Sequence, residues 1–320
     1  MEDKLLNSAS TAVKQCLAVN ETETVAIITD QLEREIAYAL FEVCKQVARE
    51  TIIVEIIPRQ HHGEEPPSAV AKLMQEVDVI IAPTFRSLSH TQARRKASDS
   101  GVRIATMPGI LRETFIRAMN VNYNSIAEDS ENIAEMLSAA RNARIITANG
   151  TDIAMKLEGR RGIADTGILH RKGAFGNLPG GEAYIAPIEK SASGTIVIDG
   201  AIGDTGVLNS DDYITIRVVD GSAREIDGGR AATYLASLLA TQPKDARNIA
   251  EFGIGTNPSA RLCGNILEDE KVRGTIHIAL GDNASMGGNV SVPIHLDGII
   301  LAPTVYLDGK MIMERGKFKI

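Results

Sequence analysis

In residues 1–148, short apolar runs rich in β-branched residues alternate with longer segments whose apolar residues recur at helical spacing. Such runs are typical of buried strands, and the longer segments of amphipathic helices. We expect strands at residues 25–29, 51–57, 78–82 and 102–106, and helices at residues 31–50, 68–77 and 124–144. Because strands that alternate with helices form βαβ units, residues 1–148 are predicted to form a doubly wound α/β domain with a mostly parallel sheet.

From Thr151 onward, glycine becomes frequent and helical segments become rare. Short segments with strand-like alternation lie at residues 195–198, 213–219 and 276–280, and one helical segment at residues 231–240. We therefore expect a second, β-rich α+β domain at residues 149–320.

Composition excludes several partners. The chain has 34 Lys and Arg against 41 Asp and Glu, a formal net charge of −7, so a nucleic-acid surface is not expected. No apolar run approaches the ~18 residues that a membrane span requires, and the N-terminus does not resemble a signal peptide.

Three cysteines without CxxC spacing indicate reduced thiols. We expect a cytoplasmic protein. A dinucleotide cofactor is not expected, since the turn at residues 29–32 lacks glycine.

Two glutamates of the second half have unusual surroundings. Glu182 follows Pro179-Gly180-Gly181, a turn that allows close approach of a ligand or a metal ion, although a solvated surface turn is the alternative. Glu251 lies among small and apolar residues, where a carboxylate needs a cation or several hydrogen-bond donors.

Two histidines interrupt strand-like apolar segments. His277 lies in residues 274–281, and His295 in Pro293-Ile294-His295-Leu296-Asp297. Residues two apart on a strand project from the same face, so His295 and Asp297 can bind one ion together. Core histidines held only by hydrogen bonds are the alternative. The neighbours His61 and His62 lie on a polar loop and are expected to point apart, as surface residues.

Glu182, Glu251, His277, His295 and Asp297 would suit Zn²⁺, Co²⁺, Mn²⁺ or Fe²⁺. Five ligands exceed the usual need of one catalytic ion and match two ions about 3.5–4 Å apart, which would activate a water molecule for hydrolysis. One of the carboxylates, Glu182 or Glu251, would be the general base.

At these residues the sequence resembles the M29-type metallo-aminopeptidases, the aminopeptidase T and aminopeptidase S group. The matching segments are residues 159–160, 176–182, 251–257, 269–271, 274–281 and 295–297. The resemblance implies two metal ions held by the five residues named above, removal of N-terminal residues from peptides, and a homodimer. This chain is shorter than those enzymes and lacks the tyrosine that they carry soon after the equivalent of His277.

The length resembles a sister group, the 2,5-dihydroxypyridine dioxygenases, which bind one Fe²⁺ and share the His-Leu-Asp segment. Those enzymes carry histidine where Glu251 stands, serine where His277 stands, and no glutamate at Glu182. The ligand set therefore favours a metal-dependent hydrolase, an aminopeptidase, over a ring-cleaving dioxygenase. A non-catalytic binding module with the same fold is the third alternative.

Overall fold

The computed structural model describes residues 3–320, whose contacts divide the chain into two compact units. The first unit contains the chain up to residue 127 together with residues 165–180, and the second contains residues 128–164 and 181–320. Each unit is discontinuous in sequence because residues 165–180 supply the last strand of the first unit's sheet.

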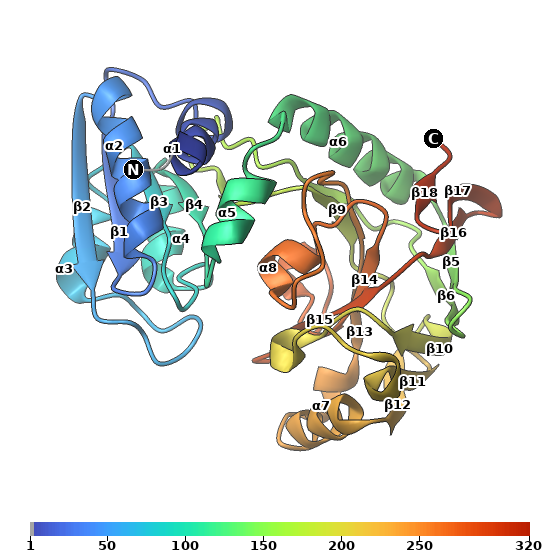
Figure 1. The fold of residues 1–320 in the computed structure, drawn as a ribbon. Coiled ribbons are helices and arrows are strands. Elements are labelled where there is room, and N and C mark those ends of the chain that lie inside the picture. Colours follow the sequence, from blue (N-terminus) through green and yellow to red (C-terminus); the bar gives the residue numbers. More distant parts are fainter. Residues whose placement is uncertain (1–2) are drawn as a thin grey trace. The chain divides into compact units, whose positions relative to one another are not determined.

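That sheet is parallel throughout, in the order β2-β1-β3-β4-β8 (Figure 1). Its strands are β1 (Thr24–Asp30), β2 (Glu50–Ile56), β3 (Val79–Ala82), β4 (Arg103–Thr106) and β8 (Phe175–Asn177). The expected parallel α/β fold is confirmed, and the four strands expected from apolar runs all form. β8 was not expected, since three residues with one aromatic side chain give no strand pattern.

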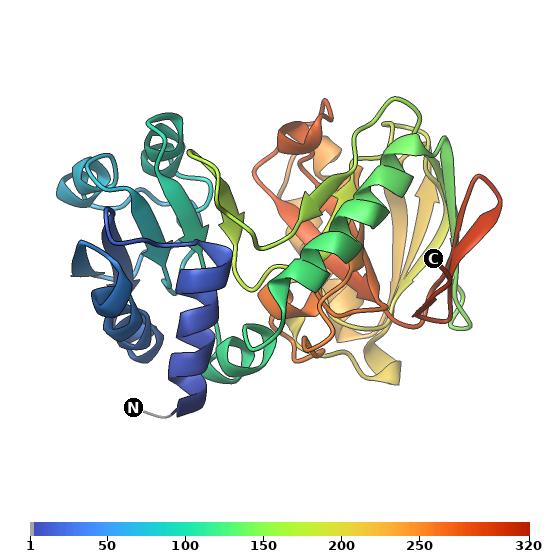
Figure 2. The same cartoon turned by 90° about the horizontal axis from the view of Figure 1, so that it is seen from above.

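Helices cover both faces of this sheet, as expected of parallel strands. The side chains of Ala26, Ile28, Ile80 and Ile104 pack against α3 and α4 in one apolar cluster. In Figure 2, the blue helices α1 and α2 lie on one side of the strands and the cyan and teal helices α3 and α4 on the other. The helical segments are α1 (Asp3–Ser10), the π-helical η1 (Thr11–Cys16), α2 (Arg34–Val47), α3 (Ser68–Leu73), α4 (Gln92–Asp99) and α5 (Arg112–Ala118).

The second unit contains two largely antiparallel sheets. The larger has the order β12-β11-β10-β6-β5-β16-β17-β18, and the smaller has the order β15-β14-β13-β9-β7. Strands of the larger sheet are β5 (Asn142–Ile146), β6 (Asp152–Lys156), β10 (Ser193–Ile198), β11 (Ile214–Val219), β12 (Ser222–Gly228), β16 (Thr304–Leu307), β17 (Lys310–Glu314) and β18 (Lys317–Phe318). Strands of the smaller sheet are β7 (Ile163–Asp165), β9 (Glu182–Ile185), β13 (Ile249–Gly255), β14 (Ile276–Gly281) and β15 (His295–Ile300).

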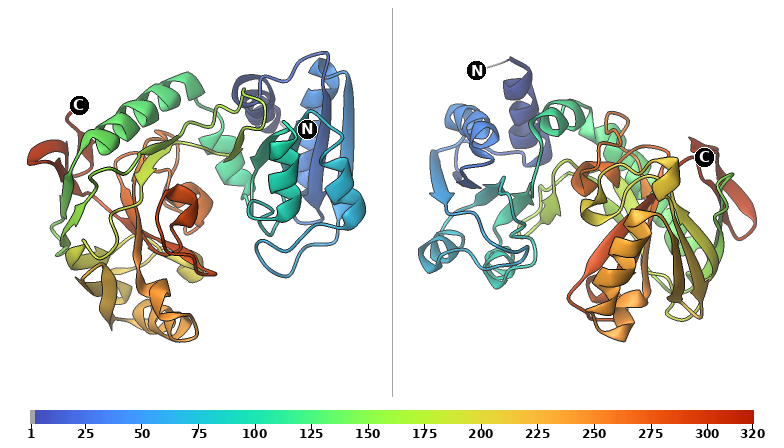
Figure 3. Two further views of the ribbon diagram at one scale, coloured as in Figure 1. Left: turned by 180° about the vertical axis from the view of Figure 1, so that it is seen from behind. Right: turned by 60° about the horizontal axis from the view of Figure 1, so that its bottom comes forward.

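One apolar core joins the two sheets of this unit. Ile196 and Ile216 of the larger sheet share it with Phe252 and Ile278 of the smaller one, and Leu137 of α6 contributes to it. α7 lies against β11 and β12 (Figure 3). The helical segments are α6 (Tyr123–Ala139), α7 (Arg230–Ala240), α8 (Ile266–Asp269) and the short 3₁₀ turns η2 (Gly203–Thr205), η3 (Ser210–Asp212), η4 (Lys244–Arg247) and η5 (Ala284–Met286). The expected β-rich fold is confirmed.

Among residues 3–320, the structure has no helix that is long and apolar enough to cross a membrane. Cys16 and Cys44 are buried free thiols, and Cys263 is an exposed one.

Candidate metal centre

The alternation of side chains along the smaller sheet gathers the five candidate ligands on one face. Phe252, Ile278 and Ala183 point into the core between the two sheets. Their neighbours therefore project from the opposite face, because successive side chains on a strand alternate. These neighbours are Glu182 on β9, Glu251 on β13 and His277 on β14. On β15, His295 and Asp297 share that face, and Asp297 pairs with Ala279 of β14.

Glu251 lies at the middle of the cluster and contacts both histidines through different oxygens. Its Oε1 is 3.0 Å from Nε2 of His277, and its Oε2 is 3.2 Å from Nε2 of His295. His277 Nε2 is also 3.3 Å from Oε2 of Glu182, and His295 Nε2 is 3.3 Å from Oδ1 of Asp297. Glu251 thus connects the two ends of the cluster.

The side chains form two overlapping groups with metal-ligand spacing. In one group the ligand atoms of Glu182, Glu251 and His277 all lie within 4.8 Å of one another. In the other, the ligand atoms of Glu251, His295 and Asp297 meet the same limit. Four of the five residues are buried, and His295 has the most exposed side chain, at 31%. A divalent ion could therefore be bound at either end of Glu251.

Buried polar atoms without hydrogen-bond partners indicate that the cluster suits a cation. Oε2 of Glu182, Oδ1 of Asp297 and Nδ1 of His277 are buried and accept or donate no hydrogen bond among the described residues. Buried polar atoms without partners are rare in native proteins. Two of these three atoms are carboxylate oxygens that face imidazole nitrogens. Mixed imidazole and carboxylate donors fit a divalent transition metal, Fe²⁺ included. Metal binding at this cluster is therefore plausible.

The acidic groups of the cluster differ in proton affinity. Burial raises the pKa of Glu182 to about 8, although the charge of Lys271 opposes this shift. Burial also acts on Glu251, but hydrogen bonds from His277 and His295 outweigh it and lower the pKa of that carboxyl. The charges of His295 and His277 likewise overcome the burial of Asp297 and hold its pKa below the ordinary range. Glu251 and Asp297 are thus ionised near neutral pH, whereas Glu182 holds its proton up to about pH 8.

The two imidazoles bind protons tightly in the absence of a metal ion. Burial alone would lower the pKa of His277, but its hydrogen bond to Glu251 and the nearby carboxylates raise the value to about 9. Asp297 and Glu251 raise the pKa of His295 above its ordinary value in the same way, against the effect of burial. A metal ion would have to displace these protons.

The backbone carbonyl of Asp282 fixes the orientation of the His295 ring. Nδ1 of His295 lies 2.8 Å from this carbonyl oxygen, which can only accept, so Nδ1 carries the proton of the neutral ring. Nε2 is then the nitrogen that faces Glu251 and Asp297 with a free lone pair. This arrangement is typical of metal-binding histidines.

Two charged residues of the cluster, Glu270 and Lys271, lie in a segment that carries the resemblance to the aminopeptidases but were assigned no role from the sequence. Lys271 is 1% exposed, and its Nζ donates to Oε1 of Glu182 at 2.6 Å and to Oε1 of Glu270 at 2.5 Å. Both residues follow the single turn of α8 in a polar segment, where a solvated surface is the usual expectation. No local pattern signals their burial.

The structure brings together all five residues singled out from the sequence, and their assignment as metal ligands stays a prediction. His62 does not join them. Its Nδ1 accepts a hydrogen bond from the backbone N–H of Ser87 at 3.1 Å, and its Nε2 lies 3.1 Å from Arg86 Nη1. His61 is exposed, as expected of a surface residue.

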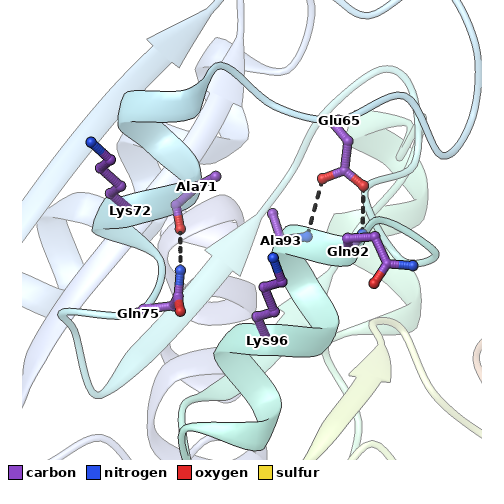
Figure 4. Close-up of a pocket in the computed structure, with 7 residues that line it drawn as sticks. All are labelled: Glu65, Ala71, Lys72, Gln75, Gln92, Ala93 and Lys96. Carbon is purple, nitrogen blue, oxygen red and sulfur yellow. Dashed lines mark hydrogen bonds between the residues drawn. The ribbon is translucent and has the colours of Figure 1, made fainter.

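Two pockets lie outside the cluster. A cavity of about 330 Å³ between α3 and α4 is lined by Lys72, Lys96 and Glu65, among others (Figure 4). The Glu65 carboxylate accepts hydrogen bonds from the backbone N–H groups of Gln92 and Ala93, so it anchors the start of α4. A second cavity, of about 650 Å³, lies beside the β5–β16 pair of the larger sheet. Neither is lined by any of the five candidate ligands.

Comparison with known proteins identifies relatives that span nearly the whole chain. A family model described as NicX, 2,5-dihydroxypyridine 5,6-dioxygenase, matches residues 4–320. A 2,5-dihydroxypyridine 5,6-dioxygenase from Pseudomonas putida is 27% identical over 329 aligned positions, which cover 93% of this chain and 91% of that protein.

Two solved structures share the fold. The 2,5-dihydroxypyridine dioxygenase from Pseudomonas putida KT2440 has a TM-score of 0.82 at 20% identity, covering 98% of this chain and 96% of that one. AmpT from Thermus thermophilus has a TM-score of 0.70 at 17% identity, covering 99% of each chain. The fold implied by the resemblance to the aminopeptidase T group is therefore supported.

The expected activity is wrong. The family match over residues 4–320 and the 27% identical dioxygenase contradict the expectation of an aminopeptidase. The broader expectations of a peptide hydrolase and a protease are wrong for the same reason. The error has a chemical cause, because imidazole and carboxylate ligands serve both hydrolytic and oxygen-activating metal ions. The ligand set of the aminopeptidases differs from that of the dioxygenases at Glu182, Glu251 and His277. Ligand types alone nevertheless do not determine the reaction.

Proposed function

Because the chain belongs to the 2,5-dihydroxypyridine 5,6-dioxygenase family, we propose that it is a ring-cleaving dioxygenase that uses one Fe²⁺ ion and acts on a hydroxylated pyridine. In this reaction one carbon–carbon bond of the ring breaks, and both atoms of O₂ enter the product. No external reductant is needed, since the ring supplies the electrons. The observation that carries the proposal is the family match over residues 4–320.

We propose that the iron is held by Glu251, His295 and Asp297. Three observations support this choice. Their ligand atoms lie within 4.8 Å of one another, Asp282 orients the His295 ring, and Oδ1 of Asp297 has no hydrogen-bond partner among the described residues. Iron, when bound, supplies the one-electron chemistry that allows O₂ to react with an aromatic ring.

The remaining residues would handle protons and charge. A hydroxypyridine must lose a proton before its ring becomes electron-rich enough to react with oxygen. Of the two glutamates considered as general base, Glu182 is the better candidate, because its pKa of about 8 lies near neutral pH. Glu251 is ionised and is assigned as a ligand. Its position between the two histidines would keep both imidazoles turned toward the ion.

The test is oxygen uptake by the protein reconstituted with Fe²⁺ under anaerobic conditions. On addition of 2,5-dihydroxypyridine in air-saturated buffer, we expect one O₂ consumed per substrate, loss of the aromatic absorbance and, with ¹⁸O₂, two labelled oxygen atoms in the product. The Asp297→Ala variant should consume none. No oxygen uptake with 2,5-dihydroxypyridine or with other mono- and dihydroxypyridines would overturn the proposal.

The homodimer and the cytoplasmic location expected from the sequence remain predictions. Light scattering in solution tests the first of them.

A further inference from the structure

Two loop segments of the first unit, residues 57–67 after β2 and residues 83–87 after β3, meet outside the carboxyl ends of β1 and β3. α2 follows β1 on one face of the parallel sheet, whereas α4 follows β3 on the other face (Figure 2). The chain therefore leaves these two neighbouring strands in opposite directions. In open α/β sheets, small ligands bind at such a place.

Hydrogen bonds join the two segments and direct two donors toward one point. The N–H of Gly63 donates to the carbonyl of Ser87 at 2.8 Å, and the N–H of Ser87 donates to Nδ1 of His62 at 3.1 Å. Because Nδ1 accepts, the ring proton of His62 is on Nε2. That nitrogen lies 3.1 Å from Nη1 of Arg86, which can only donate. Neither atom can accept from the other, so the arrangement suits an acceptor that both donors share.

The charge of Arg86 has no counterion within residues 3–320. Its Nε is buried and donates to no atom of this part of the chain, and no carboxylate forms an ion pair with the guanidinium there. The guanidinium lies over the Phe85 ring, with 4.5 Å between Cζ and the ring centroid, and this stacking fixes its plane. The pair that Nη1 forms with His62 is exposed, so a ligand can reach it. A partly buried guanidinium without a carboxylate partner favours an anionic ligand.

Two exposed apolar side chains lie at the same ends of β1 and β3. Asp30, the last residue of β1, accepts from the N–H of Leu32 through Oδ1 and from the N–H of Phe85 through Oδ2. This single carboxylate therefore holds Leu32 and Phe85 near each other, and both side chains are exposed. An apolar ring attached to the anion could lie against them.

We propose that Arg86 and His62 bind the carboxylate of a small aromatic acid outside the carboxyl ends of β1 and β3. The carboxylate supplies the acceptor that the two donors share and the negative charge that Arg86 lacks. Its ring would lie against Phe85 and Leu32. All four residues belong to the first unit, so the inference depends neither on the metal centre nor on the proposed function.

The test is calorimetric titration of the full-length protein with benzoate, once with Mn²⁺ and once after chelation. We expect one site per chain with the same affinity in both titrations, because the site contains no metal ligand. Benzamide, the neutral isostere, should bind at least ~10-fold more weakly, since it lacks the charge. Inorganic phosphate carries the charge without the apolar ring and should also bind at least ~10-fold more weakly than benzoate. Absence of benzoate binding, a requirement for Mn²⁺, or phosphate binding as tight as that of benzoate would each overturn the proposal.

Substitutions locate the benzoate site. Arg86→Met removes the charge and His62→Phe removes the second donor, so each should weaken benzoate binding at least ~10-fold. Arg49→Met is the matched control, since it removes one positive charge at the amino end of the same sheet, where Arg49 donates to Oγ1 of Thr24. It should bind benzoate as the wild type does. Wild-type affinity in a folded Arg86→Met, or a loss of binding in Arg49→Met as large as in Arg86→Met, would contradict the assignment. The titrations of the wild type decide the ligand class even if one variant fails to fold.

Discussion

Gly253 lies opposite His277 in the β13–β14 ladder, and the imidazole occupies the space that a side chain at Gly253 would fill. A Cβ atom built at Gly253 would lie 1.9 Å from Nε2 of His277. The glycine is thus required by the cluster and not by the backbone, since its φ does not lie in the left-handed region. His277 can contact Glu251 only because Gly253, its cross-strand partner, has no side chain.

The first prediction follows from this contact. Gly253→Ala should force His277 away from Glu251 and lower the affinity for Mn²⁺ or Fe²⁺ by at least ~10-fold, as measured by metal titration. Gly298→Ala is the matched control, because its Cβ would meet the flexible Cδ1 of Ile198 on the core side of β15. It should destabilise the protein by about 1–3 kcal/mol and leave metal binding intact. Equal metal affinities in the two variants would contradict the assignment.

The second prediction concerns the ligands on β15. His295→Ala and Asp297→Ala should each abolish metal binding, while the first unit stays folded, because both residues lie in the second unit. Elemental analysis and hydrogen exchange of the β1–β4 amides provide the two measurements. His61→Ala, on an exposed loop, is the control and should keep its metal. Unchanged metal content in either β15 variant would show that the site lies elsewhere.

The sequence allowed prediction of those features that depend on local pattern. Apolar, β-branched runs located β1 to β4, and the two-residue spacing placed His295 and Asp297 on one face of a strand. β8 could not be found this way, since Phe175–Asn177 forms a strand only because it pairs with the edge strand β4. Lys271 was assigned no role for the same reason. Its partner Glu182 is 89 positions away in the chain, and such a pair leaves no local signal.

The reaction class could not be derived from the ligands. Glu182, Glu251 and His277 favoured a hydrolase because their types match a two-metal site, yet imidazole and carboxylate ligands also serve oxygen-activating metal ions. The reaction class was corrected by the family match over residues 4–320 and not by the ligands. Residue identity predicted the members of the cluster, whereas their charge balance required three-dimensional contacts.

The third prediction concerns the loop that precedes β15. The Glu189 carboxylate accepts hydrogen bonds from the backbone N–H of Asn289 and from the Asn283 side chain, and it pairs with Arg160, which also donates to the carbonyl of Gly287. This network holds residues 282–289, including the Asp282 carbonyl that orients His295. Glu189→Ala should therefore weaken metal binding by about tenfold, as expected for loss of support behind a ligand.

Two variants control for this effect. Glu189→Gln keeps an acceptor for the two amide groups and should stay close to the wild type in metal affinity. Glu225→Ala removes a carboxylate from an exposed ion pair with Arg217 and should have no effect on the metal. If Glu189→Ala bound Mn²⁺ as tightly as Glu225→Ala, the loop would not support His295.

The last prediction concerns Glu33, which precedes α2 in the first unit and is 9% exposed. Burial, with a smaller contribution from the charge of Asp30, raises its pKa from 4.5 to about 7. The unfolded chain releases this proton at a lower pH than the folded chain does. The stabilisation associated with protonated Glu33 is therefore present below about pH 4.5 and is lost as the pH rises to about 7.

Glu33→Gln removes this titration. The stability of the variant relative to the wild type should increase by about 1–2 kcal/mol between pH 5 and pH 8, as measured by urea unfolding followed through a signal of the first unit. Glu42→Gln, on the same helix, controls for the loss of one negative charge from α2. Other groups titrate equally in both proteins and cancel in the difference. A pH-independent difference between Glu33→Gln and the wild type would mean that Glu33 is ionised in the folded protein throughout this range.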